Sequence, residues 1–188
     1  MTIDLEQLLG DLLRLGTIAE VDPSRASCRV TTGEITTGPL PWLAPRAGGV
    51  AVWSPPTVGE QCLLLCPEGD IMSGLVLLGL FSDSFPAPSD DPDLVLVALP
   101  DGAQISYHHR NHRLEAALPS GGTALVDADG GLTIRGNVTI TGNVSIKGDA
   151  MATGTVTGQT NVVGGGISLK EHKHSGVSTG SGKTGGPE

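Results

Sequence analysis

The sequence predicts an all-β protein built from a small barrel, a set of hairpins and a narrow β shaft that three identical chains share. Short apolar runs alternate with turn clusters between residues 16 and 82, which is typical of a small barrel. Further along, glycine recurs every six residues from Gly136 to Gly154. Only 3% of the 188 residues are aromatic and 28 are glycine, so the second half lacks the large side chains of a self-sufficient core.

Residues 1–15 are expected to form a docking helix. The apolar side chains of residues 3–15 are close to helical spacing: Ile3, Leu5, Leu8, Leu9, Leu12, Leu13 and Leu15. Thr2 or Asp4 could cap this helix and Gly16 could end it. Two roles stay open for the helix, packing on its own domain or docking against a neighbouring subunit.

Residues 16–88 are assigned to the barrel. Strand-like runs such as Gln61–Cys66 and Ser73–Leu80 are separated by turns such as Asp22-Pro23-Ser24. Prolines at 86 and 88, followed by an acidic pair, mark the boundary. Three cysteines, an odd number, lie inside apolar runs, so buried free thiols are expected: Cys28, Cys62 and Cys66.

Residues 89–130 are expected to form β-hairpins that begin the shaft. The apolar run from Leu94 to Leu99 is followed by a turn at Pro100-Asp101-Gly102 and by a second strand. A histidine cluster comes next, at His108, His109 and His112, with arginines interleaved. The interleaved charge favours a surface turn over a metal site.

Residues 131–170 are predicted to form the shaft, because the six-residue period is typical of fibrous or solenoid architecture. Its apolar residues are all even-numbered and shrink along the chain: Leu132, Ile134, Val138, Ile140, Val144, Ile146, Ala150, Ala152 and Val156. In continuous β-structure these side chains share one face, and threonine, serine and lysine occupy the other. A face one strand wide cannot bury itself. Three chains wound together would bury the face and pair every strand edge.

Residues 171–188 form the expected apex, with His172-Lys173-His174 before a glycine-rich tail. Two histidines at i and i+2 of a strand lie on one face, but two imidazoles are too few for a tight site. Three chains would supply six, an octahedral shell that suits Fe(II) or Ni(II) better than Zn(II). Leu169 is odd-numbered and His172 even, so a bulge or irregular turn is required near Lys170.

The charge distribution excludes several partners. The net charge is −9, and residues 1–135 carry 7 Lys or Arg against 17 Asp or Glu. An acidic body argues against nucleic acid and against docking on anionic lipid. There is no apolar run long enough to span a bilayer and no signal-peptide pattern, so synthesis in the cytoplasm is expected.

Several segments together resemble baseplate assembly protein V, the central spike of contractile phage tails, which is related to the spike part of VgrG proteins. The segments are Gly16–Pro23, Leu40–Leu43, Val58–Gln61, Gly69-Asp70, Gly79–Ser82, Pro86–Pro88, Glu171–His174 and Gly182–Pro187. The resemblance implies a homotrimer with an N-terminal OB-fold, an intertwined triple-stranded β-helix and an iron ion (Fe2+) at the apex. It also implies that His172 and His174 of each chain hold the iron. The large hub domain of VgrG proteins is absent, which favours a simpler phage or tailocin spike.

The expected function is therefore mechanical and not enzymatic. The chain would be a virion protein at the tip of the tail tube, contacting baseplate hub and tail-tube proteins and piercing the target outer membrane. The alternative is a trimeric binding module whose OB-fold recognises a cell-surface glycan. A phosphate-binding loop at 180–184 is rejected because the required glycine is replaced by Val177. Four hexads are too few for a hexapeptide-repeat acyltransferase.

Overall fold

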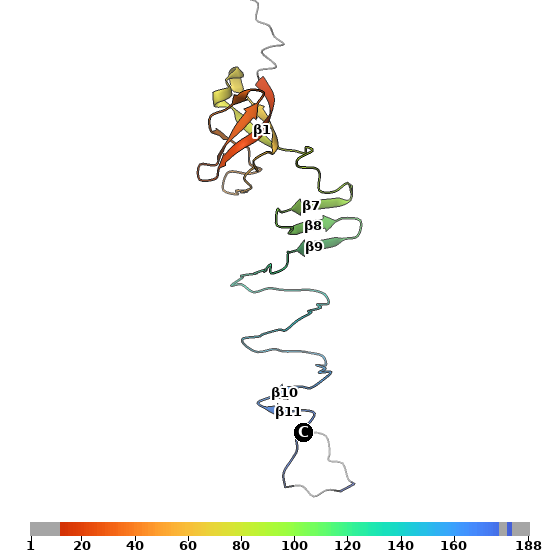
Figure 1. The fold of residues 1–188 in the computed structure, drawn as a ribbon. Helices are drawn as coiled ribbons and strands as arrows, with labels where there is room; N and C mark the ends of the chain where they lie inside the picture. Colours follow the sequence, from red (N-terminus) through yellow and green to blue (C-terminus); the bar gives the residue numbers. More distant parts are fainter. Residues whose placement is uncertain (1–11, 177–179, 182–188) are drawn as a thin grey trace, which may run out of the picture. The chain divides into compact units, whose positions relative to one another are not determined.

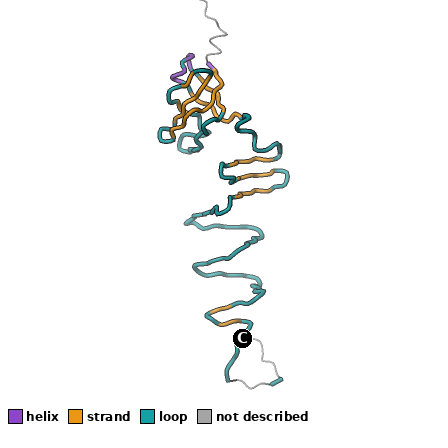
Figure 2. Tube along the Cα trace, in the orientation of Figure 1, coloured by secondary structure: helices purple, strands orange, loops and turns teal. Residues whose placement is uncertain are grey.

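The computed structural model describes residues 12–176 and 180–181. The fold is all-β, and its described helical residues are Leu12, directly before the first strand, and two single 3₁₀ turns, η1 (Pro67–Gly69) and η2 (Ile71–Ser73) (Figures 1 and 2). The chain divides into two compact units, residues 1–126 and 127–188. No helix in the described residues is long and apolar enough to cross a membrane.

A six-stranded antiparallel sheet forms the N-terminal barrel. Its strands are β1 (Leu13–Asp22), β2 (Ser27–Thr32), β3 (Ile35–Thr36), β4 (Leu40–Pro41), β5 (Gln61–Leu65) and β6 (Leu75–Leu80). The order is β3-β2-β1-β5-β6, and β4 also pairs with β2. The sheet closes where Trp42, just after β4, bridges to Val76 of β6, and the Leu43 N–H donates to the Val76 carbonyl at 2.8 Å. The predicted barrel is therefore confirmed.

The helix predicted for residues 3–15 is wrong at its C-terminal end. Leu13 and Leu15 belong to β1, where they pair with Leu65 and Leu63 of β5. Their spacing of two fits a strand as well as a helix, and the hydrogen bonds to β5 decide between them. Gly16 does not end a helix. It lies within β1, where a Cβ would be 2.4 Å from Val30 Cγ1. Residues 3–11 lie outside the described part of the chain.

The barrel interior is filled by aliphatic side chains and thiols. The buried residues in contact are Ile18, Cys28, Val30, Leu40, Trp42, Cys62, Leu64, Cys66 and Val76. The three cysteines are free and at most 2% exposed, which confirms the expectation of buried thiols. Burial raises the pKa of Cys28 and of Cys62 to about 11.

A separate three-stranded sheet follows, made of β7 (Leu94–Ala98), β8 (Gln104–His108) and β9 (Arg113–Ala117). Its register places Val95, Tyr107 and Leu114 opposite one another, and Val97, Ile105 and Ala116 likewise. Side chains that lie directly opposite share one face. This face is apolar and uncovered within the chain, with Val95 66% and Leu114 75% exposed.

The second unit is extended, and the strand pairing in its described residues is confined to β10 (Val163–Gly164) and β11 (Ile167–Ser168) (Figure 2). The hexad repeat is nevertheless regular in the backbone. Gly136, Gly142 and Gly148 have φ of +137°, +143° and +142°, a region that L side chains rarely adopt. Glycine at positions 136, 142 and 148 is therefore a conformational requirement of the repeat.

Candidate metal centre

The β10–β11 hairpin positions the two C-terminal histidines. Its turn residues, Gly165 and Gly166, have φ of +56° and +82°, which glycine adopts without a steric penalty. Asn161 and Ser168 brace the hairpin, because the Asn161 Nδ2 donates to Ser168 Oγ at 2.9 Å and its Oδ1 accepts from the Val162 N–H at 2.9 Å. The chain therefore enters the histidine segment from a hydrogen-bonded support.

A turn separates Ser168 from His172. The His172 N–H donates to the Ser168 carbonyl at 3.0 Å, and the Glu171 N–H donates to Ser168 Oγ at 3.0 Å. Residues 169–171 are consequently a turn and not strand. This is the irregularity that strand parity required near Lys170, and that expectation is confirmed.

His172 and His174 lie side by side at the end of this turn. Their ring centroids are 5.1 Å apart and the rings are nearly perpendicular, at 77°. His172 Nδ1 lies 3.1 Å from both the Ser168 and the Leu169 carbonyl oxygens. A carbonyl partner fixes the proton on Nδ1, which leaves the Nε2 lone pair available. This arrangement is the usual support of a metal-binding histidine.

One chain does not complete a metal site. Among residues 12–176 and 180–181, no three His, Cys, Asp or Glu side chains lie close enough to hold an ion. The donors present fit a divalent transition metal in kind, because imidazole suits iron and nickel. The two imidazoles of one chain are too few to hold such a metal, and the site would be complete only if further chains contribute the same pair.

Two histidines of the second cluster contact carboxylates instead. His108 Nε2 lies 3.2 Å from Asp91 Oδ2, and His109 Nε2 lies 3.0 Å from Asp93 Oδ1. Arg110 Nε contacts the other oxygen of Asp93 at 2.7 Å. The backbone N–H of Asp93 lowers the pKa of Asp91, and His108 lowers it further. The cluster fastens the β8–β9 turn to the residues before β7, as expected of a surface turn.

Sequence reasoning did not identify the carboxylates in this cluster. The sequence indicates Asp91 only as part of the boundary pair Asp90-Asp91 and gives Asp93 no role, because nothing local links either residue to residues 108–110. The signal that could have found them is the β7–β8 register, in which Leu94 lies opposite His108. Extending that register by one position places Asp93 opposite His109.

Known protein families match segments at both ends of the chain. Residues 14–81 match the Type VI secretion system/phage-baseplate injector OB domain, and residues 166–188 match the GpV Apex motif. The spike protein of Escherichia phage P2 is 38% identical over 130 residues. The chain carries the OB domain and the apex motif of phage-baseplate spike proteins. The aligned region covers 69% of this chain and about three fifths (61%) of the length of the phage P2 spike protein.

The family match confirms the resemblance inferred from the sequence and identifies the barrel as an OB domain. The matched segment begins at residue 14, inside β1, and ends at residue 81, directly after β6. The apex match includes β11 and both histidines of the candidate centre.

Proposed function

We propose that the chain is the central spike of a contractile phage or phage-derived tail, and that three copies form a needle that pierces the target outer membrane. One observation carries the proposal. The six even-numbered Leu, Ile and Val residues from Leu132 to Ile146 are uncovered to almost the same degree, from 58% for Val138 to 68% for Leu132, and Val156 further along is 74% exposed. Equal exposure over successive hexads, with equal glycine φ angles, describes one regular apolar stripe.

In a single chain the stripe remains in contact with water, so its side chains contribute no free energy of burial. Fully burying one Leu, Ile or Val side chain contributes roughly 1.5–3 kcal/mol, so even a partial burial of six such residues would stabilise an assembly strongly. Three-fold winding would bring the stripes together on one axis. It would also supply strand partners for the extended backbone, whose N–H and C=O groups need them.

The β7–β9 sheet supports the same assembly. Its face of Val95, Val97, Ile105, Tyr107 and Leu114 is also uncovered. Uncovered apolar faces therefore occur in both units of the chain. Three copies would cover both of them in one structure.

The proposed mechanism is mechanical, and no catalytic step is involved. Sheath contraction would supply the force, and the OB domain would connect the spike to baseplate hub and tail-tube proteins. Most of the shaft together with the apex carries little net charge, with 4 Lys or Arg and 3 Asp or Glu in residues 136–188. A nearly neutral needle would not be held by charged head groups as it passes through the membrane.

The apex would hold one metal ion, iron by family resemblance, between His172 and His174 of three chains. The match to the GpV Apex motif supports a metal-binding end. The contact of His172 Nδ1 with two backbone carbonyls supports coordination through Nε2. A shared metal would tie three chain ends into one rigid point and so offset their conformational entropy.

Metal analysis combined with native mass spectrometry tests this proposal. The wild-type protein should have the mass of three chains with one transition metal. His172→Ala/His174→Ala should lose the metal and keep the three-chain mass, because the shaft is intact. His108→Ala/His109→Ala is the matched control and should keep both. A metal-free wild-type protein would contradict the proposed metal site at the apex. A single-chain mass would contradict the proposed three-chain spike.

A further inference from the structure

The outer face of the barrel carries six leucines on three adjacent strands. The register places Leu13, Leu65 and Leu75 in one row and Leu15, Leu63 and Leu77 in the next. We call these residues the leucine face. Residues that lie directly opposite across antiparallel strands point to the same side of the sheet. The alternate residues Cys62, Leu64 and Val76 are buried inside the barrel, so the six leucines point outward.

Much of this face is open in the single chain. Leu13 is 55% exposed, Leu15 62% and Leu77 41%, and the other three are partly buried by their neighbours. A contiguous exposed apolar patch usually marks an interaction site. The six leucines span three strands of a pleated sheet, and Leu77 at the edge of the face also lines a hollow with residues 43–45 and 54–56. A partner that covers all six leucines is a protein surface and not a small molecule.

We infer that the leucine face is a contact surface between the OB domains of the copies of this chain. The inference rests on the proposed function, because it requires the three-chain assembly. The occupant is apolar, since none of the six positions carries a charge or a hydrogen-bonding group that a polar partner could use. The leucine face of a second copy of the chain is apolar in the same way and is therefore the proposed occupant.

The length of the tether favours a second copy over a foreign partner. Phe85 is fastened to the barrel, because the Phe85 N–H donates to the Ser82 carbonyl at 3.1 Å and its ring packs on Gly59, where a Cβ would lie 3.4 Å from Cε2. Eight residues, 86–93, then lead to β7. Fully extended, they span at most about 28 Å.

Three shafts wound together would therefore hold three barrels within a short distance of one axis. Tethering of this kind gives local concentrations on the order of millimolar, at which a weak apolar contact forms without further help. The leucine faces would turn toward one another and form a collar above the shaft. The collar would be a second area of contact, separate from the hexad repeat and from the apex.

Thiol labelling of the full chain tests the contact. Leu15→Cys places a thiol at the most exposed leucine of the face, and Glu34→Cys, in the exposed turn between β2 and β3, is the matched control. The native cysteines are at most 2% exposed, so a maleimide reports on the introduced thiol. In the three-chain protein, the thiol at position 15 should react about tenfold or more slowly than the thiol at 34, because it is accessible only when the contact opens.

A charge on the face gives an independent readout. Leu15→Lys should separate the barrels, so that spin labels at Glu34→Cys show a broadened distance distribution while the native mass stays that of three chains. Ile35→Lys is the control, because Ile35 is 47% exposed on the same barrel but outside the leucine face. It should leave the distances unchanged.

The outcomes separate this inference from the proposed function. A single-chain mass for the wild-type protein would overturn both. A three-chain mass with equally fast labelling at positions 15 and 34 would overturn the leucine-face contact alone. Removal of residues 2–11 should leave the thiol at position 15 protected. Loss of protection in that variant, with the three-chain mass retained, would assign the face to the N-terminal segment and overturn the contact between barrels.

Discussion

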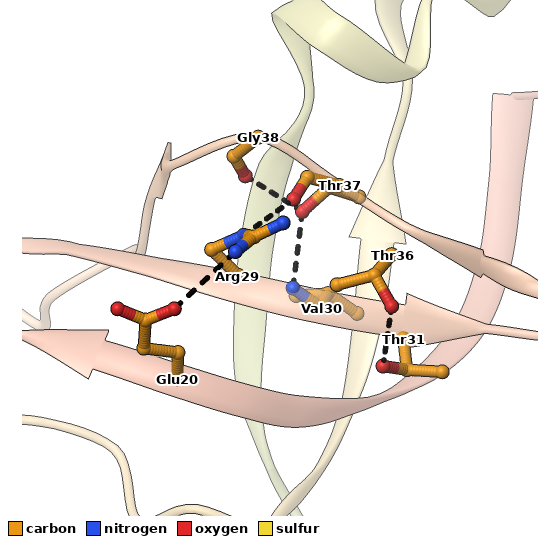
Figure 3. A network of polar contacts seen from close by, with 7 residues as sticks. All are labelled: Glu20, Arg29, Val30, Thr31, Thr36, Thr37 and Gly38. Carbon is orange, nitrogen blue, oxygen red and sulfur yellow. Dashed lines mark hydrogen bonds and ion pairs between the residues drawn. The ribbon is translucent and has the colours of Figure 1, made fainter.

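Thr37 and Val30 are joined by two hydrogen bonds, one through the backbone and one through the Thr37 side chain, which continue the β2–β3 pairing beyond Thr31 and Thr36. The Thr37 N–H donates to the Val30 carbonyl at 2.9 Å, and the Val30 N–H donates to Thr37 Oγ1 at 3.0 Å (Figure 3). The Thr37 hydroxyl itself donates to the Gly38 carbonyl at 2.7 Å. Thr37 is only 1% exposed, and its buried hydroxyl both accepts and donates a hydrogen bond inside the OB domain.

Replacing this hydroxyl should destabilise the barrel. Thr37→Val keeps the shape but leaves the Val30 N–H buried without its acceptor, which costs about 1–3 kcal/mol. Thr36→Val is the control, because Thr36 is exposed and its hydroxyl contacts only Thr31 Oγ1; its change should lie within about 0.5 kcal/mol. Urea unfolding followed by tryptophan fluorescence measures both. Equal effects of the two substitutions would show that the hydroxyl of Thr37 has no special role.

Gly74 should not tolerate a side chain. An alanine Cβ there would lie 2.9 Å from Leu64 Cδ1 and 3.2 Å from Leu40 Cδ1, both in the core. Gly74→Ala should therefore lower the free energy of unfolding by about 1–3 kcal/mol through overpacking. Gly48→Ala, where no atom lies within 4 Å of the new Cβ, is the matched control. It should be neutral or slightly stabilising, and a larger loss at position 48 than at 74 would contradict the described packing.

The barrel should lose stability at alkaline pH. Burial raises the pKa of the Cys28 and Cys62 thiols from 9.0 to about 11, so the folded state retains protons that the unfolded chain releases. The stabilisation is complete below pH 9 and is lost as pH rises to about 11, by roughly 1–3 kcal/mol for each thiol. Urea unfolding at several pH values measures this slope. The Cys28→Ala/Cys62→Ala variant should be less stable at pH 7 and should have a flatter profile from pH 9 to 11; an unchanged slope would exclude the thiols as its cause.

The two faces of the hexad repeat should respond differently to charge. Ile140→Asp places a carboxylate in the proposed shared core and should dissociate the three chains or prevent their assembly. Thr139→Asp places the same group one residue earlier, on the opposite face, and should leave the assembly intact. Native mass spectrometry of both variants distinguishes these outcomes. Dissociation by both substitutions, or by neither, would be inconsistent with a one-sided stripe.

The repeat and the barrel were predictable because both have strong local patterns. Glycine at every sixth residue and the even-numbered aliphatics need no knowledge of distant contacts. The β1 boundary was not predictable, because Leu13 and Leu15 fit helical and strand spacing equally well until β5 is known to be their partner.

The leucine face was hidden for a related reason. In the run Leu63-Leu64-Leu65 both sides of the strand are apolar, so the sequence does not indicate which leucines face outward. The support of His172 was also invisible, because it depends on the carbonyls of Ser168 and Leu169 and not on any side chain. Only the need for a turn near Lys170 could be deduced, from the parity of the flanking residues.

The most direct test of the account is a structure of the purified full-length protein with anomalous scattering measured at the iron absorption edge. The account predicts three chains wound around one axis, with Ile140 and Val144 in the shared core. A single anomalous peak should lie on that axis, coordinated by His172 and His174 of all three chains. A single-chain particle, or three chains whose histidine pairs lie apart with no metal between them, would contradict it.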